Sequence, residues 1–310
     1  MSQVVTRCFD RCARIAALGF LAASLLLQSQ NAKLVRPPIT GVDHVAILVS
    51  SQSEAERFYV RHLGLQRVPL SGDMAFSYAV NPTQSLETLT GAEKRGSRID
   101  HVAFATADAE ALRRYLGTRG VTVPAKCDGA SDGSLEFAVT DPEGNPVEFV
   151  QRGRQASIPR PGHTAVSTRL IHAGIVVHDP AAEDNFYRDV LGFHLYWKGG
   201  MKEGVTDWVS MQVPDGTDWI EYMLNVGPNA SAEQRGVMNH IALGVSDIHA
   251  GDRALKATGW TPTQREQPQL GRDGKWQLNV YDSDQTRVEF MEFRPVEKPC
   301  CSPYTGPHPH

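Results

Sequence analysis

Four stretches of this sequence share one pattern, in which a histidine stands at the start of a short apolar run. The stretches are VDHVAILV (42–49), IDHVAFAT (99–106), IHAGIVV (171–177) and NHIALGV (239–245). A helix-like stretch ending in glycine follows each one, at intervals of 20, 19, 20 and 19 residues from the histidine: His44–Gly64, His101–Gly120, His172–Gly192 and His240–Gly259. Internal similarity at a regular spacing indicates a repeated structural unit, and a glycine after a helix is typical of a C′ position with positive φ.

Further strand-like runs follow each glycine. We therefore expect four strand–helix–strands modules at about 41–91, 98–151, 168–226 and 237–294. The segment QRGRQASIPRPGHTAVST between the second and third modules is rich in Gly, Pro, Ser and Thr, which is the composition of a linker. The modules group into an N-terminal domain (41–151), a linker (152–167) and a C-terminal domain (168–294), and 310 residues suffice for two such cores.

Large apolar side chains alternate with the histidine in each apolar run. Because neighbouring strand residues point to opposite faces, Val45 and Ile47 face away from His44, and the other three runs follow the same pattern. The residue two places after each histidine is small: Ala46, Ala103, Gly174 and Ala242. A histidine in a close-packed core would have large neighbours on its own face, whereas small neighbours leave space beside the imidazole. The pattern favours histidines that face a cavity, and a core histidine is the alternative for each strand taken singly.

A glutamate lies in the last strand-like run of each module. Burying a lone carboxylate between apolar residues is costly unless it is paired or bound to a cation. Two histidines with one or two carboxylates suit a divalent Fe, Mn, Zn, Ni or Co ion. The predicted metal ligands are His172, Glu221, His240 and Glu289 in the C-terminal domain, and His44, His101 and Glu148 in the N-terminal domain. A solvent-facing or arginine-paired carboxylate is the alternative for each glutamate, and Glu292 falls on the opposite face from Glu289.

The phrases DHVAILV…FYVRHLGL, DHVAFAT…DPEGNPVEF, HAGIVV…FYRDVLGF and NHIALGV…RVEFMEF resemble the vicinal oxygen chelate superfamily. This group includes glyoxalase I, methylmalonyl-CoA epimerase, extradiol dioxygenases and bleomycin-resistance proteins. The resemblance spans about residues 41–294 and implies an α+β fold, in which four βαβββ modules form two half-open, barrel-like cups. It implies ligands from the first and last strands of paired modules: His44, Glu87, His101 and Glu148 in one cup, and His172, Glu221, His240 and Glu289 in the other.

Three functions follow from this resemblance. The first is a metal-dependent, glyoxalase-like lyase, isomerase or epimerase that acts on a small substrate with adjacent oxygens. There the ion is a Lewis acid, and Glu221 or Glu289 is the catalytic base. The second is an extradiol-type dioxygenase, for which the resemblance implies only His172, His240 and Glu289 as ligands. The run YDSDQTRVE before the last of these lacks the expected Pro and Gly, and no additional histidine stands in the preceding strand.

The third function is a non-catalytic small-molecule binding protein. Its cup would be lined by aromatic side chains, for which ordinary core packing is the alternative: Trp197, Trp208, Trp219 and Tyr222. The orientation of Glu221 separates the first two functions, because a fourth protein ligand favours the lyase or isomerase. A Glu221 that turns away favours the oxygenase.

The two ends of the chain differ from the modules. MSQVVTRCFDRCAR is basic, IAALGFLAASLLL (15–27) is apolar, and Ala32 stands at a plausible cleavage point, which is the order of a signal peptide. An apolar run this short falls below the about 20 residues that span a bilayer. We predict a signal peptide at 1–32 and export to the periplasm or beyond. An uncleaved anchor is the alternative, and a cytoplasmic location follows if the leader is not a signal.

The tail KPCCSPYTGPHPH (298–310) contains Cys300, Cys301, His308 and His310, which could bind copper or zinc. An extended, poorly packed tail (295–310) is the interpretation that we favour. The net charge is −4 and no block of five like charges occurs, which argues against a nucleic-acid partner. We expect a small-molecule substrate and no stable membrane span after signal cleavage, and we leave a homodimer open.

Overall fold

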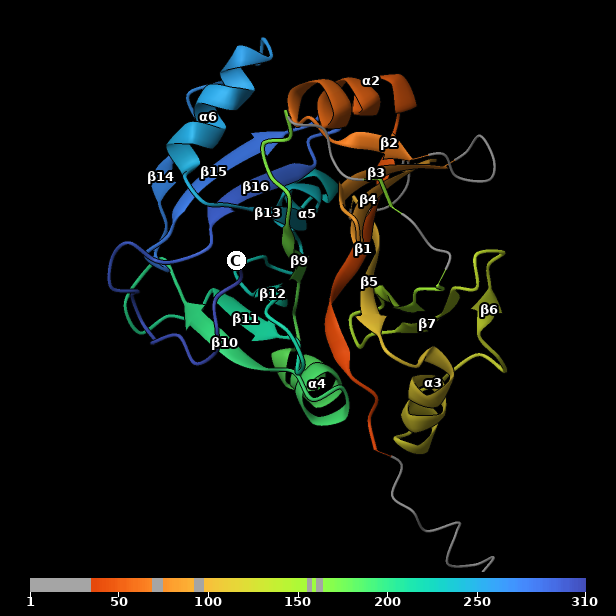
Figure 1. Cartoon of the computed structure of the whole chain (residues 1–310). Coiled ribbons are helices and arrows are strands. Elements are labelled where there is room, and N and C mark those ends of the chain that lie inside the picture. The colour runs from red at the N-terminus through yellow and green to blue at the C-terminus, as the bar shows by residue number, and fades with distance from the viewer. Residues whose placement is uncertain (1–34, 69–74, 92–97, 155–157, 160–163) are drawn as a thin grey trace, which may run out of the picture. The chain divides into compact units, whose positions relative to one another are not determined.

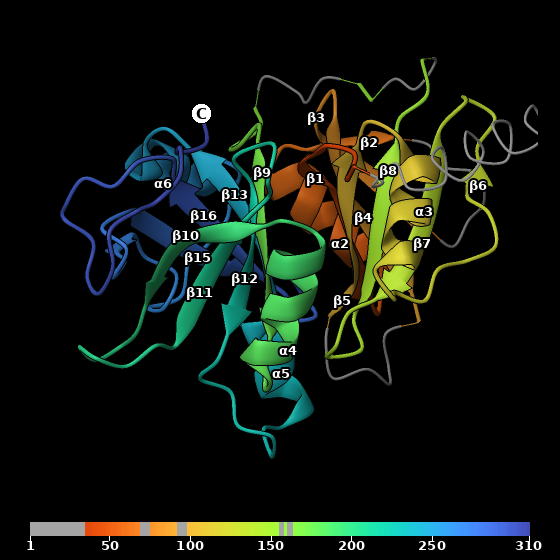
Figure 2. The same cartoon turned by 90° about the horizontal axis from the view of Figure 1, so that it is seen from below.

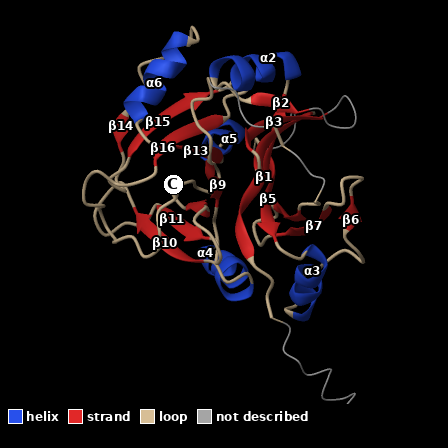
Figure 3. Cartoon of the chain, viewed as in Figure 1, coloured by secondary structure: helices blue, strands red, loops and turns tan. Residues whose placement is uncertain are grey.

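The computed structural model describes residues 35–68, 75–91, 98–154, 158–159 and 164–310. Residues 37–310 form one compact unit. Two eight-stranded sheets dominate it, with short helices between the strands (Figures 1 and 3). The predicted signal peptide at 1–32 lies outside the described residues, so it stays a prediction.

The first sheet contains the strands of the first two modules. Its strands are, in spatial order, β2 (Gln66–Val68), β3 (Ala75–Asn81), β4 (Gln84–Thr90), β1 (Ile39–Val49), β5 (Ile99–Thr106), β8 (Pro146–Gln151), β7 (Leu135–Thr140) and β6 (Asp128–Gly129). The two strands that begin the modules, β1 and β5, are antiparallel neighbours at its centre. Each also pairs in parallel with the last strand of its own module, β4 or β8.

The second sheet repeats this order with the strands of the last two modules. Its strands are β10 (His194–Gly199), β11 (Trp208–Gln212), β12 (Trp219–Met223), β9 (Leu170–Val176), β13 (His240–Val245), β16 (Arg287–Glu292), β15 (Trp276–Tyr281) and β14 (Gln269–Leu270). The equal order in both sheets confirms the predicted α+β fold, in which βαβββ modules pair to form two half-barrel cups.

Short helices follow the first strand of each module: α2 (Gln52–Glu56) with the π-helical η1 (Arg57–His62), α3 (Ala109–Thr118), α4 (Pro180–Asp184) with the π-helical η3 (Asn185–Val190), and α6 (Ile248–Ala257). A further helix, α5 (Ala232–Met238), precedes β13. A side chain caps each module helix at its first turn, as Asp108 does by accepting the Ala111 N–H. Among the described residues, no helix is both long and apolar enough to cross a membrane.

The π-helical segments explain the alternating spacing of histidine and glycine. In the first and third modules, the Leu63 N–H donates to Phe58 and the Leu191 N–H to Phe186, each across five residues at 3.0 Å. A π-turn accommodates one residue more than an α-turn, so these modules have an interval of 20 residues where the other two have 19. The four glycines have φ angles of +75°, +84°, +81° and +86°, as predicted for C′ positions: Gly64, Gly120, Gly192 and Gly259.

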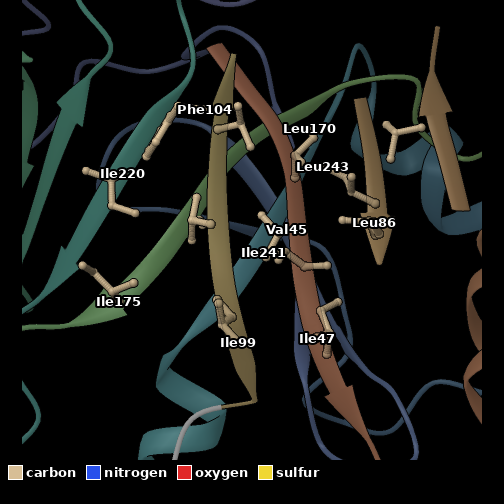
Figure 4. Packing of buried hydrophobic residues seen from close by; sticks show 14 of the residues in the cluster. Val45, Ile47, Leu86, Ile99, Phe104, Leu170, Ile175, Ile220, Ile241 and Leu243 are labelled. Atoms are coloured by element: carbon tan, nitrogen blue, oxygen red, sulfur yellow. The ribbon is translucent and has the colours of Figure 1, made fainter. Parts of the chain in front are cut away.

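The core confirms the predicted alternation of strand faces. Val45, Ile47 and Val49 belong to one large buried cluster, whereas Ala46 and His44 on the other face do not. The cluster includes helix residues such as Tyr59. Figure 4 shows the core side chains gathered around the strands, including several from both halves of the chain. Strand β1 of the first sheet and strand β9 of the second lie side by side (Figure 2).

The C-terminal tail is packed, so the expectation of a loose tail is wrong. The Trp197 indole N–H donates to the Cys300 carbonyl at 3.2 Å, and the Thr305 N–H donates to the Tyr196 carbonyl at 3.0 Å. These bonds tie the tail to β10, because backbone groups that leave water require partners. Cys300 and Cys301 form a disulfide. The groups with metal-binding spacing among the described residues include no residue of this tail.

Candidate metal centres and catalytic cup

Strand register brings the four C-terminal candidates together. One row across β12, β9 and β13 contains Glu221, Gly174 and His240, which pair with one another in that order. A second row, two residues along each strand, contains Trp219, His172, Ala242 and Glu289. Because residues two apart on a strand share a face, both rows point into one cup.

The donor atoms of this cluster converge, with the two histidine Nε2 atoms 3.0 Å apart. His240 Nε2 lies 3.4 Å from Glu221 Oε2 and 3.3 Å from Glu289 Oε2. Both carboxylate oxygens lie 3.8 Å from His172 Nε2. For metal–ligand bonds of about 2.1 Å, donor atoms are about 3.0 Å apart at right angles and about 3.4 Å apart in a tetrahedron. Among the described residues, His172, Glu221 and His240 have donor atoms that all lie within 4.8 Å of one another, which is a spacing that could hold one divalent ion.

The N-terminal cup contains a matching cluster. His44 Nε2 lies 3.0 Å from His101 Nε2 and 3.2 Å from Glu148 Oε2, and the His101–Glu148 distance is 3.5 Å. Glu87 has a donor atom within 4.8 Å of both histidines, in a group that does not include Glu148. Every histidine and glutamate that the resemblance implied thus points into its own cup.

The N-terminal histidines have carboxylate partners on their outer nitrogens. His44 Nδ1 lies 2.9 Å from Asp43 Oδ1, and His101 Nδ1 lies 3.0 Å from Asp100 Oδ2. Arg152 holds Asp43 with two hydrogen bonds of 2.8 and 2.7 Å. Such partners fix the proton on Nδ1 and leave Nε2 free for a metal. Our sequence analysis missed these aspartates, although each stands immediately before its histidine.

His44 and Glu148 form a charged pair in the N-terminal cup. Burial lowers the pKa of His44, but hydrogen bonds to Asp43 and Glu148 outweigh it and raise the pKa to about 10. Burial likewise raises the pKa of Glu148, but the hydrogen bond and charge of His44 bring it below its usual value. Binding of a metal at Nε2 therefore requires His44 to release a proton.

The C-terminal histidines have a different environment. His172 stacks on Trp219 with ring centroids 4.6 Å apart, and its Nδ1 has no hydrogen-bond partner among the described residues. Burial and the charge of His240 hold the pKa of His172 well below its usual value, so His172 is neutral. His240 Nδ1 lies 3.0 Å from the Met238 carbonyl and 2.6 Å from Arg287 Nη2. Residues other than aspartate precede both histidines here.

A cavity of about 410 Å³ lies beside the C-terminal cluster and is lined by Glu221 and Glu289. Three of the four aromatic residues singled out in the sequence line it: Trp197, Trp208 and Trp219. Core packing, the alternative for all four, also holds. Tyr222 belongs to the large core cluster. Trp197 and Trp219 belong to a second buried cluster, against which Trp208 packs. Our sequence analysis did not single out Lys275 and Arg287, which also line the cavity.

The model of the Glyoxalase/Bleomycin resistance protein/Dioxygenase superfamily matches residues 41–149 and 169–290. The chain belongs to this superfamily. The lactoylglutathione lyase of Haemophilus influenzae is 29% identical over 125 residues, which cover 40% of this chain and 92% of that protein.

Two solved structures show the same fold. A variant of homoprotocatechuate 2,3-dioxygenase from B. fuscum, in complex with HPCA, superposes with a TM-score of 0.62 at 20% identity, covering 83% of this chain and 72% of that chain. The Mn(II)-bound glyoxalase from Novosphingobium aromaticivorans superposes with a TM-score of 0.63 at 17% identity, covering 83% of each chain. At these identities the likeness concerns the fold.

Proposed function

We propose that this protein is a metal-dependent, glyoxalase-like lyase, isomerase or epimerase, and that its reaction takes place in the C-terminal cup. The orientation of Glu221 supports this most strongly. Its Oε2 lies 3.4 Å from His240 Nε2, on the wall of the 410 Å³ cavity. A fourth inward-facing ligand is what separates the glyoxalase-like arrangement from the oxygenase arrangement of three.

His172, His240, Glu221 and Glu289 would hold the ion. When bound, a divalent ion supplies Lewis acidity, which acidifies the hydrogen on a carbon next to the coordinated oxygens. Glu221 then takes that proton from one carbon and returns it to a neighbouring carbon, so that protons balance over the reaction. The hydroxyl of Ser210 lies 3.4 Å from Glu221 Oε1 and orients this carboxylate.

Glu289 is the better permanent ligand of the two glutamates. Burial raises its pKa, but the hydrogen bond and charge of His240 outweigh this and lower it. A carboxylate that stays ionised is suited to holding a cation. We assign the metal-holding role to Glu289 and the catalytic role to Glu221.

We propose that the N-terminal cup binds a second ion through His44, His101 and Glu148. The aspartates behind both histidines support this, because such outer partners raise the basicity of a metal-binding imidazole. The donor set suits Fe, Mn, Zn, Ni or Co. Mn(II) is the first ion to test, since the N. aromaticivorans glyoxalase has it bound.

Exchange of carbon-bound hydrogen tests the reaction class without the native substrate. Hydroxyacetone has oxygens on two adjacent carbons, and its carbonyl acidifies the C–H bonds of the carbon that bears the hydroxyl. We expect the Mn(II)-loaded protein in D₂O to catalyse deuterium incorporation at that carbon, followed by NMR after removal of the metal. Glu221→Gln should reduce the rate by about 100-fold or more, as for loss of a general base, with metal content measured in parallel.

Glu292→Gln is the matched control, because Glu292 lies on the opposite face of β16 and accepts the Ile248 N–H at 2.9 Å. It should leave exchange unchanged. Absence of exchange in the native protein, or equal rates in Glu221→Gln, would contradict the proposal.

An extradiol-type dioxygenase is the second candidate. The wall formed by Trp197, Trp208 and Trp219 supports it, because such a surface suits a flat aromatic ring. Oxygen uptake by the Fe(II)-loaded protein with catechol, in place of deuterium exchange, would favour this function.

We also propose that the protein is exported, on the strength of its basic and apolar leader. Glutathione is chiefly cytosolic, so an exported enzyme would act on a substrate without it. Cell fractionation of the full chain and of a chain lacking residues 2–32 tests this. Equal distribution of both chains would contradict export by this leader.

A further inference from the structure

A buried ammonium lies in the wall of the C-terminal cup. Lys275, immediately before β15, has no exposed surface, and it lines the same cavity as Glu221 and Glu289. Its Nζ lies 5.1 to 5.3 Å from the ring centroids of three aromatic residues: Tyr196, Trp219 and Tyr304. Rings at this distance attract a cation through their faces. Two rings come from the sheet and one from the C-terminal tail.

This ammonium lacks a close counter-ion. Among the described residues, its only hydrogen bond is to the Tyr196 hydroxyl, at 3.3 Å, and no carboxylate lies within salt-bridge distance. Asp273, two residues away, directs its oxygens to the Tyr304 hydroxyl, the Gln277 amide and the Lys275 backbone N–H, each at 3.2 Å. An ammonium has three N–H donors, so two remain for a group in the cavity.

The side chain is charged at neutral pH. Burial lowers the pKa of Lys275, and the negative charges of Asp273, Glu289 and Glu221 limit the fall to about 8. A buried charge without a close partner is unfavourable unless a ligand supplies one.

We propose that Lys275 binds an anionic oxygen of the substrate. This inference rests on the proposed function of the C-terminal cup and adds a substrate class: small acids in which an anionic oxygen lies close to the metal-binding oxygens. That oxygen belongs either to a carboxylate substituent or to one of the two adjacent oxygens in ionised form. Tyr304 is the third aromatic ring around the Lys275 ammonium. Because Tyr304 belongs to the C-terminal tail, the tail is then part of the substrate site.

Calorimetric titration of the Mn(II)-loaded protein with two anions tests the proposal. Oxalate has adjacent oxygens that can chelate a metal, whereas phenylacetate has a carboxylate that one methylene group joins to an aromatic ring. We expect Lys275→Met to weaken binding of at least one anion by tenfold or more. Loss for phenylacetate alone identifies a substituent carboxylate as the partner, and loss for oxalate identifies a metal-binding oxygen.

Lys198→Met is the control, because Lys198 is an exposed lysine on β10, two residues from Tyr196. It should bind both anions as the native protein does. Lys275→Gln provides a second neutral variant in case the first fails to fold, and Lys275→Arg should restore binding to within a few-fold. Equal affinities in native protein and the folded neutral variant, or no binding of either anion to native protein, overturn the proposal.

The phenylacetate titration is repeated on metal-free protein. If the native chain binds no metal, the proposed function fails, while this titration still tests Lys275. If metal binds and substitution of Lys275 changes the affinity for neither anion, the proposed function stands and this inference fails.

Discussion

Gly174 lies directly opposite His240 in the antiparallel pair of β9 and β13, and a Cβ atom at Gly174 would collide with the imidazole ring. The small residue that follows one histidine thus makes room for the histidine of the paired module. The same relation recurs across the centre of each sheet: Ala103 opposite His44, Ala46 opposite His101, and Ala242 opposite His172. The sequence pattern belongs to pairs of strands rather than to single strands.

Replacement of Gly174 tests this relation. We expect Gly174→Ala to displace the His240 ring, to lower Mn(II) affinity at the C-terminal cup at least tenfold, and to destabilise the fold by about 1–3 kcal/mol, as overpacking does. Metal titration in a His101→Ala background and urea unfolding measure the two effects. Gly227→Ala is the control, because a Cβ there meets no atom within 4 Å. Equal behaviour of both variants would refute the role of Gly174.

Asp43 hydrogen-bonds His44 Nδ1, the ring nitrogen that faces away from the cup. We expect this contact to strengthen metal binding at the N-terminal cup. Asp43→Asn weakens the acceptor for His44 Nδ1, so Mn(II) affinity should fall by about 10- to 100-fold. Calorimetry in a His240→Ala background measures Mn(II) binding at the N-terminal cup alone, because the C-terminal cup then lacks a ligand. Asp128→Asn, an exposed change on β6, should leave affinity unchanged. If Asp43→Asn binds metal as tightly as Asp128→Asn does, the aspartate has no such role.

A buried acid on α4 makes stability depend on pH. Glu183 has no exposed surface, and burial together with the charge of Asp141 raises its pKa from 4.5 to about 8. Between these values the folded state keeps a proton that the unfolded state releases. The native protein should therefore lose up to about 1.4 kcal/mol of stability per pH unit from this group as pH rises from about 5 to 8.

Glu183→Gln removes that pH dependence. The variant should gain stability relative to native protein as pH rises, and the difference should shrink towards pH 5. Urea unfolding at several pH values measures it, with exposed Glu203→Gln as control. A difference that is constant over this pH range would show that Glu183 is ionised in the folded state.

Removal of the tail should open the C-terminal cavity. Truncation after Arg294 deletes Tyr304 and the carbonyl of Cys300 that accepts the Trp197 N–H. The tryptophans that line the cavity should then emit at longer wavelength and be quenched more strongly by acrylamide. His310→Ala, at the exposed chain end, should change neither property. Identical emission and quenching in truncated and native protein would mean that the tail does not cover this cavity.

Strand parity made both cups predictable from the sequence. His44 and Glu148 lie far apart in the chain, but each stands next to a large apolar residue, Val45 or Val147, that points into the core. Because neighbouring strand residues face opposite sides, His44 and Glu148 must face the cup. Parity predicts the outward face equally well, since Glu292 turns away from the cup and accepts the Ile248 N–H. Glu87 was harder to place because its neighbours in the sequence are polar.

Other site residues depend on contacts that alternation does not encode. Lys275 stands in the run GRDGK, which is typical of an exposed turn, and the tail residue Tyr304 contributes to its burial. Asp43 adjoins His44 where β1 shifts register against β5, between Val42 and His44, so simple parity does not apply there. The sequence shows that the histidine–glycine interval of the first and third modules is one residue longer than that of the other two. It does not show that a π-turn accommodates this residue.

Metal content of the purified chain tests the central claim most directly. After loading with Mn(II) and removal of excess ion, elemental analysis should find about two ions per native chain, about one in His240→Ala, about one in His101→Ala and none in the double variant, since each cup has its own histidine pair. A native chain that retains no ion, or folded variants that retain as much as native protein, would contradict the account.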